Sequence, residues 1–465
     1  MELWSAERVC IRGRFEKDWG VMTDDHGVIQ AIGPRKQLVA RAKSVSHYPG
    51  RILIPGFINP HHSGFHRIFR GLANFSAPFQ EIREKLVWPL SQIIDGDLWE
   101  AVYRVAFAEL LFNGITTVGE FFYMHHGAAK EPQPSHYAKR LIDIAVEMGL
   151  RINLVFAFFD QGASENTKAF IQPLDASLEE FRFLKEHYRN QPLVKILPGV
   201  HSLEHTSAEA ILAAAELARE FDSPLHVLLA DSPESLDRAK LHYGVSPLRA
   251  LEKMEVLDGR VVVIHGTHLD EEELGMMKRH DMMAVVCPSA SLARGSEFPN
   301  TFGLLREEVP FAVGSSTLGI NNTYSVPDEI KLLEFTQRSV QKQMNVLSSQ
   351  MRVSSLLELG TTLPAKALGL EASQLMPGTP ADFMLVEVVE PIYQPDFNYA
   401  SQHFMNQLLF GWGTQVKITH TIVQGKPVIA NGMLAYDLGP SVRKLERWSE
   451  LLLNFIKKVS QPVTA

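Results

Sequence analysis

Cysteine is scarce in this chain, with only Cys10 and Cys287 among 465 residues. Two thiols so far apart in the sequence predict neither a disulfide framework nor a metal cluster built from cysteine. The first residues lack the basic and then apolar profile of a secretory signal. No apolar run approaches the ~18 residues of a membrane span. We therefore expect a soluble, cytoplasmic protein.

An excess of positive charge is also missing. Lys and Arg number 45 against 53 Asp and Glu, which gives a net charge of -8. A nucleic-acid-binding surface needs clustered positive charge to contact the phosphates, and no stretch of the sequence provides it. The chain has no Gly-rich phosphate loop and no Gly-x-Ser-x-Gly motif, which argues against a phosphate site and against serine hydrolysis. The expected partner is a small molecule, with no nucleic acid and no membrane.

The hydrophobic pattern changes twice along the chain. A composition of 45% hydrophobic and 21% charged residues is that of an ordinary globular protein. Short alternating runs up to residue 55 predict a small antiparallel β-structure, and similar runs return after residue 376. Between them, short apolar segments alternate with longer helical patterns, as in βα units around a parallel sheet.

The middle segment contains eight candidate strands, at Ile52–Ile58, Thr116–Phe121, Ile152–Phe158, Val194–Gly199, Leu225–Ala230, Val261–Ile264, Met283–Cys287 and Phe311–Gly314. Eight such units predict a protein of the α/β class with a TIM-type (β/α)8 barrel over residues 56–375. Residues 1–55 and 376–436 together predict a small β-sandwich domain formed from both chain ends.

Two helices can be bounded from the sequence. In the barrel segment, Asp97 is the expected N-cap of a helix that Gly114 ends. Apolar residues three or four positions apart between 442 and 456 predict a C-terminal helix within residues 437–465. Its polar positions carry both signs of charge, so we expect it to dock on the protein's own body rather than on a membrane.

Several motifs resemble one family over nearly the whole chain. Pro55-Gly-Phe-Ile-Asn-Pro-His61-His-Ser63, the barrel pattern and the split sheet resemble the amidohydrolase superfamily, in particular its aminohydrolase branch. Gly119-Glu-Phe-Phe-Tyr-Met-His-His126 is similar to a segment of formiminoglutamate deiminases, and the His61-His62 pair is similar to that of 8-oxoguanine deaminases. The resemblance implies a hydrolase that acts on C–N bonds of a small nitrogenous compound, and a homodimer.

The metal-binding positions of that family are altered here. Its members hold a divalent metal with two His of the first strand, a His of the fifth and an Asp of the eighth. His61 matches the first ligand, whereas Ser63, Leu228 and Ser316 stand at the other three. Serine is a poor metal ligand and leucine is none, so the resemblance implies a degenerate metal site and no cofactor. A shifted register that brought His226 into the site would leave zinc possible.

Other positions of the family's pocket still carry side chains that can take part in acid–base chemistry. By resemblance, His265 and His201 lie at the ends of the sixth and fourth strands, and Asp231 replaces a glutamate that moves protons. These three are the candidate catalytic residues. The candidate substrate-binding residues are His66, Arg83, Tyr123 and Asn321.

Three interpretations stay open. The preferred one is a deaminase- or deiminase-like hydrolase that works without the usual metal. The second is a non-catalytic relative that binds a small molecule or a partner. The third is an ordinary zinc deaminase whose ligand register differs from the one assigned above.

Overall fold

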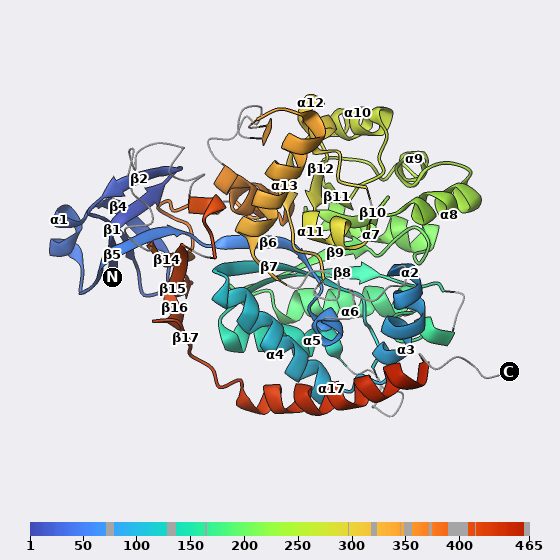
Figure 1. The fold of residues 1–465 in the computed structure, drawn as a ribbon, viewed down its shortest axis with the longest axis horizontal. Helices are drawn as coiled ribbons and strands as arrows, with labels where there is room; N and C mark the ends of the chain where they lie inside the picture. Colours follow the sequence, from blue (N-terminus) through green and yellow to red (C-terminus); the bar gives the residue numbers. More distant parts are fainter. Residues whose placement is uncertain are drawn as a thin grey trace.

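A computed structural model of the chain describes residues 1–70, 79–127, 136–162, 165–295, 297–317, 323–344, 346–347, 356–371, 374–388, 408–413 and 415–459. A barrel occupies most of the molecule, and a smaller β-structure lies at one side of it (Figure 1). Both chain ends contribute strands to that smaller structure.

Eight parallel strands form the barrel in sequence order. They are β6 (Phe57–His62), β7 (Ile115–Phe122), β8 (Arg151–Phe158), β9 (Val194–Val200), β10 (Leu225–Leu229), β11 (Val261–His265), β12 (Met283–Val286) and β13 (Phe311–Val313). A bridge between His62 and Ser316 joins the first strand to the chain just after the last, so the barrel is nearly closed. The predicted TIM-type barrel is confirmed, and each of its seven strands predicted after residue 100 is present with its ends within one residue.

The first predicted strand, Ile52–Ile58, is wrong as a single element. β5 (Ser44–Pro55) ends at Pro55 in the smaller sheet, and β6 begins at Phe57 in the barrel. Gly56 lies between them, where an added Cβ would come within 2.3 Å of the Thr116 hydroxyl oxygen. The chain therefore changes sheets at a position that only glycine can fill, in the middle of a continuous apolar run.

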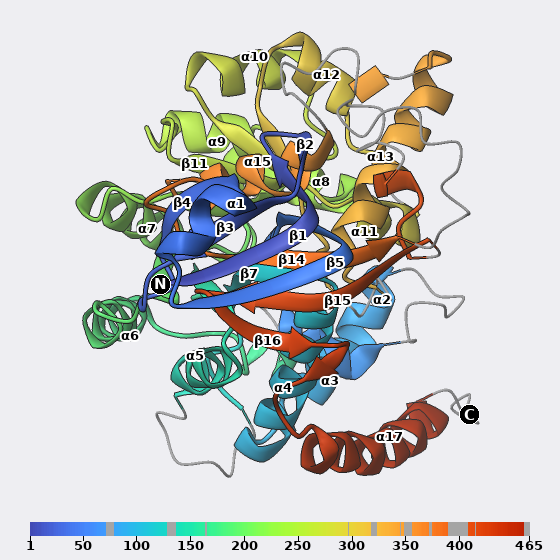
Figure 2. The same cartoon turned by 90° about the vertical axis from the view of Figure 1, so that its left-hand side faces the viewer.

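The small sandwich consists of β1 (Glu2–Ile11), β2 (Arg14–Lys17), β3 (Trp19–Thr23), β4 (Ile29–Pro34), β5, β14 (Phe383–Val388), β15 (Val416–Val423), β16 (Lys426–Ala430) and β17 (Met433–Leu434). β5 pairs parallel with β1 and antiparallel with β14, so it joins the strands from the two chain ends (Figure 2). The sheet is thus mixed, and the prediction that it is antiparallel is wrong for this one pairing. The buried side chains of Trp4, Val21 and Phe383 belong to its core.

Helices cover the barrel. The longer ones are α4 (Gly96–Phe112), α5 (Tyr137–Met148), α6 (Leu174–His187), α7 (Ala208–Glu220), α8 (Pro233–Tyr243), α9 (Pro247–Lys253), α10 (Glu271–Arg279) and α13 (Val326–Gln341). Shorter ones are α2 (Phe79–Ile82), α3 (Trp88–Ser91), α11 (Pro288–Ala293), α12 (Thr301–Arg306) and α15 (Thr362–Ala367), whereas α1 (Arg35–Leu38) packs against β3 and β4 of the smaller sheet.

The N-cap of α4 differs from the prediction. Asp95 caps the helix, because its carboxylate accepts from the Leu98 backbone N–H at 2.8 Å while its own backbone is extended. Asp97 lies in the first turn, where a negative charge still suits the helix dipole. Gly114 follows the C-cap with a φ of +70°, as expected for a residue that ends a helix.

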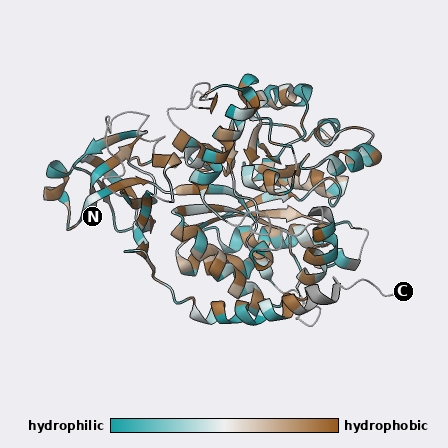
Figure 3. Ribbon diagram, in the orientation of Figure 1, coloured by the Kyte–Doolittle hydropathy of each residue, from teal (hydrophilic) through white to brown (hydrophobic). Residues whose placement is uncertain are grey.

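The C-terminal helix α17 (Gly439–Val459) packs against α4, as predicted (Figure 1). Trp448 and Leu452 are buried in this contact region, and Lys444 forms an ion pair with Asp97 at 3.0 Å. Hydrophilic and hydrophobic residues alternate along the helix (Figure 3). Among the described residues, none of the helices combines the length and the hydrophobicity that crossing a bilayer requires.

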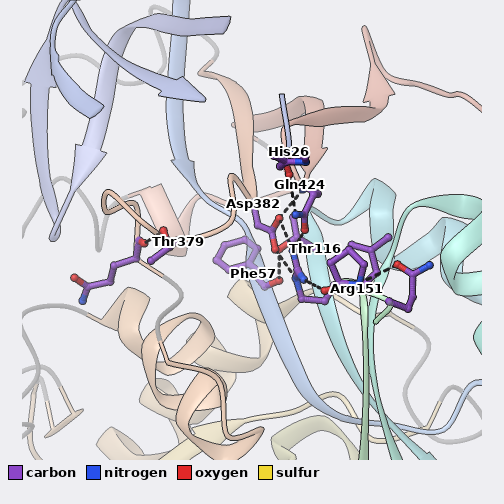
Figure 4. Close-up of polar contacts among 11 residues, drawn as sticks. His26, Phe57, Thr116, Arg151, Thr379, Asp382 and Gln424 are labelled. Atoms are coloured by element: carbon purple, nitrogen blue, oxygen red, sulfur yellow. Dashed lines mark hydrogen bonds and ion pairs between the residues drawn. The ribbon is translucent and has the colours of Figure 1, made fainter. Parts of the chain in front are cut away.

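Arg151 fastens the barrel to the sandwich (Figure 4). Its Nε donates to Oδ2 of Asp382 at 2.8 Å, and its Nη2 donates to the Gln424 side-chain oxygen at 2.8 Å. Asp382 also accepts from the Gln424 backbone N–H at 2.7 Å, and the Gln424 amide donates to the His26 carbonyl at 2.9 Å. The contact therefore links a barrel strand to both ends of the chain.

Replacing Arg151 with Met should lower the free energy of unfolding by about 3 kcal/mol, because it leaves a largely buried carboxylate without its charged partner. The Asp382 side chain is only 16% exposed. Urea denaturation followed by circular dichroism measures the loss. The matched control is Arg182→Met, which breaks an exposed ion pair with Glu220 and should cost less than about 1 kcal/mol. Equal losses of unfolding free energy in the two variants would contradict a stabilising role for Arg151 between the barrel and the sandwich.

Candidate active site

A cavity of about 330 Å³ opens at the carboxyl ends of the barrel strands. Its volume suits a small-molecule ligand. Every predicted site residue that the structure describes lines this cavity, namely His61, Ser63, His66, Arg83, Tyr123, His201, Leu228, Asp231, His265 and Ser316. Asn321 lies outside the described residues. Side chains from six different barrel strands and their loops thus meet at one place.

Two imidazoles face each other across the cavity. The His61 and His265 rings, at the ends of β6 and β11, are nearly perpendicular, with their centroids 5.5 Å apart. Burial lowers the pKa of each ring well below its usual value, and the positive charge of Arg294 lowers both further. Both rings are therefore neutral at physiological pH, and each can donate one hydrogen bond and accept another.

Arg294, which directly follows α11, holds two of the candidate catalytic groups. Its Nη1 donates to Oδ2 of Asp231 at 3.1 Å, and its Nη2 lies 3.4 Å from Nδ1 of His265. A guanidinium can only donate, so Nδ1 is the acceptor and the proton of the neutral His265 ring lies on Nε2. The sequence prediction missed Arg294. Its location after the seventh strand, at the carboxyl face of the barrel, was the available signal.

His66, Tyr123 and His201 form an aromatic wall. Nε2 of His66 lies 2.5 Å from the Tyr123 hydroxyl oxygen, and the His201 ring centroid lies 4.5 Å from that of Tyr123. Burial, followed by the charges of His62 and Arg83, lowers the pKa of His66 to about 3. Burial also raises the pKa of Tyr123. This wall therefore offers uncharged hydrogen-bonding groups and ring faces to a ligand.

The turn that carries His66 is anchored from behind the cavity. This turn, η2 (Gly64–Phe69), begins at Gly64, whose backbone N–H donates to Glu120 on β7 at 2.7 Å. The same carboxylate accepts from the Tyr103 hydroxyl at 2.7 Å and contacts the buried His62 ring. Glu120 thus sets where His66 enters the pocket without lining the pocket itself.

Besides Arg294, the charged residues of the lining include two more that the sequence prediction did not select. Arg238 pairs with Glu204 at 3.0 Å, and both lie in the lining. Three arginines (83, 238 and 294) and two carboxylates (Glu204 and Asp231) line the cavity, which leaves an excess of one positive charge beside the neutral buried histidines. Such a lining favours a neutral or anionic ligand over a cationic one.

The residues predicted at the family's metal-ligand positions make the following contacts in this structure. The Ser63 hydroxyl donates to the Phe121 carbonyl at 3.2 Å, and Leu228 has no donor atom. His226 does not line the cavity, and its Nε2 donates to the Ala367 carbonyl at 2.9 Å. Across the described ranges, no group of three or more His, Cys, Asp or Glu side chains could hold a metal ion.

Left-handed backbone conformations occur at the rim of the cavity. Ala230, His265 and Ser316 have φ values of 50°, 70° and 58°. Each such residue costs of order 1 kcal/mol and is retained only where the surroundings enforce it. The strands therefore turn sharply where they end, which aims the side chains of these segments into the pocket.

Comparison with known proteins gives one family and one fold. A sequence model of the amidohydrolase family matches residues 52–428. A 5-methylthioadenosine/S-adenosylhomocysteine deaminase of Pyrococcus furiosus is 25% identical over 376 residues, which cover 81% of this chain and 83% of that protein. A 5'-deoxyadenosine deaminase of Methanococcus maripaludis is 23% identical over 384 residues, covering 82% and 84%.

Solved structures share the fold. The crystal structure of an adenosine deaminase from Xanthomonas campestris, determined with bound zinc, matches with a TM-score of 0.84 and 21% sequence identity. The match covers 97% of this chain and 98% of that one. Because the neighbour holds zinc, a metal cofactor is possible in this fold. Whether a given chain binds a metal depends on its residues at the ligand positions.

His226 should make stability depend on pH. Burial lowers its pKa to about 4, so below pH 6.5 the unfolded chain takes up the proton more readily than the folded one. The contribution of the neutral His226 ring to the free energy of unfolding is therefore present above pH 6.5 and is lost as the pH falls towards 4. Between pH 7 and pH 5 this loss is about 2 kcal/mol.

The variant His226→Gln should remove that dependence and flatten the curve of unfolding free energy against pH by a similar amount. Denaturant titrations at a series of pH values measure it. His187→Gln is the control, because water surrounds this exposed ring in both states. An unchanged slope in His226→Gln would refute the assignment.

Proposed function

The chain belongs to the amidohydrolase family, and on that premise we propose that it is a deaminase- or deiminase-like hydrolase that works without the usual metal. Its substrate would be a small nitrogenous compound with a hydrolysable C–N bond. The observation that supports this is the composition of the pocket. Proton-transferring groups line it, while three of the four metal-ligand positions carry Ser63, Leu228 and Ser316.

The proposed reaction consumes one water and releases one ammonia. The water must lose a proton as its oxygen bonds to the substrate carbon, and the leaving nitrogen must gain one as the C–N bond breaks. The carboxylate of Asp231, oriented by Arg294, accepts the first proton. The Asp231 carboxyl then passes this proton to the leaving nitrogen, while the neutral His265 and His201 rings orient the reacting groups by hydrogen bonds and keep their own protons.

The relatives by sequence are named as deaminases of adenosine derivatives, which makes amino-purines the first substrate class for this chain. The cavity volume of about 330 Å³ admits a ligand of this size. The Tyr123 and His201 rings supply faces for a heteroaromatic ring, and Arg83, stacked 5.0 Å from the Trp88 ring, supplies a charged donor.

The purified protein should contain less than about 0.1 zinc or iron per chain, because the ligand positions offer too few donor atoms to retain an ion. Inductively coupled plasma mass spectrometry measures the metal, and the turnover of an active compound should survive dialysis against a chelator. Stoichiometric zinc whose removal abolishes turnover would establish the ordinary metal mechanism instead.

The substitution His265→Ala should lower kcat/KM by about 10² to 10³, because it removes a positioned hydrogen-bond donor from the reacting centre. The assay is ammonia release from amino-purine, imino and pterin-like compounds. His268→Ala is the matched control, since His268 lies on the same loop but pairs with Glu297 outside the main cavity, and its activity should stay within about threefold. Compounds that bind to the unmodified protein without any turnover would favour a non-catalytic relative.

A further inference from the structure

A cation lies beside one of the two facing imidazoles of the pocket. The His265 side chain, one of the two facing imidazoles, contacts the guanidinium of Arg294 through Nδ1 at 3.4 Å. The Arg294 side chain is 8% exposed, and its other branch contacts Asp231 at 3.1 Å. A largely buried positive charge therefore contacts His265 and lies close to the facing His61 ring.

The guanidinium of Arg294 is surrounded by the kinds of group that also bind metal ions, a carboxylate and an imidazole nitrogen. Asp231 supplies the negative charge and His265 supplies a nitrogen lone pair, and both contacts use the separate arms of one planar group. A divalent ion placed between His61 and His265 would meet this fixed charge in a setting of low dielectric constant, where like charges repel strongly. The two cations would exclude each other.

We propose that Arg294 is the resident cation of this pocket, taking the place of the divalent metal and orienting Asp231 and His265 for the reaction. This inference rests on the metal-independent function proposed above. Arg294 is a positioning residue, because it acts through the two side chains that it holds. A guanidinium provides a fixed positive charge and hydrogen bonds in set directions, but it does not coordinate water.

Restoring the metal ligands tests the exclusion directly. The triple variant Ser63→His, Leu228→His and Ser316→Asp restores the family's ligand types at three positions. Together with His61, which is already present, all four ligand positions are then filled. Adding Arg294→Met to it should strengthen Zn²⁺ binding by at least about 100-fold, whereas adding Arg294→Lys, which keeps the charge, should change it by less than about threefold. Competition with a chromophoric chelator measures the affinities, and circular dichroism checks the fold.

A difference under about threefold between the triple variant and its Arg294→Met derivative would overturn the proposal, whether both bind zinc or neither does. This outcome would leave the metal-free function standing, because that function is tested by the metal content and turnover of the unmodified protein.

A second measurement needs only single variants and therefore survives if the combined variants do not fold. Nitrogen-15 spectra of labelled histidine at one fixed pH report which ring nitrogen of His265 carries the proton. The unmodified protein should show the Nε2–H tautomer, and Arg294→Met should shift the population towards Nδ1–H, whereas the matched variant Arg306→Met, remote from the pocket, should not. An identical His265 spectrum in the unmodified protein and in Arg294→Met would overturn the assignment.

Discussion

The pairing that closes the barrel determines where each pocket residue lies. The Ser316 backbone N–H donates to the His61 carbonyl at 3.0 Å, next to the bridge between Ser316 and His62. One step deeper, the Asn59 side chain donates to the Ser315 hydroxyl at 2.7 Å and accepts from the Ser315 backbone N–H at 3.2 Å. These buried contacts join the first strand to the last. Because all the strands are parallel, closure gathers residues from distant parts of the sequence at one face.

Most of the barrel could be predicted because its strands are short apolar runs of regular length bounded by polar residues. β8 and β11 are examples, since all their residues are buried and their ends follow the hydrophobic pattern. The failure at Ile52–Ile58 has a physical reason. Both β5 and β6 are apolar there, and only the contact of Gly56 with Thr116, which is a tertiary contact, reveals the change of sheet.

The pocket could be predicted in part for a similar reason. His61, Ser63 and His265 stand at the ends of recognisable strands, so their meeting follows from the barrel alone. Arg294 follows a short helix, and nothing in its own segment indicates that it turns back to Asp231. Its role depends on two partners from other strands, and a single sequence does not encode such pairings in any local pattern.

The neutral state of His265 and the burial of the Arg294 guanidinium beside it depend on each other. A protonated His265 could not accept a hydrogen bond from Arg294, and its charge would add to that of the arginine in a desolvated space. Burial keeps the ring neutral, which leaves Nδ1 free to accept and fixes the proton on Nε2. A metal ion would instead acidify a bound water by direct coordination. A guanidinium has no such effect, so the proposed metal-independent reaction assigns the activation of water to Asp231, with the neutral imidazoles as its hydrogen-bonding partners.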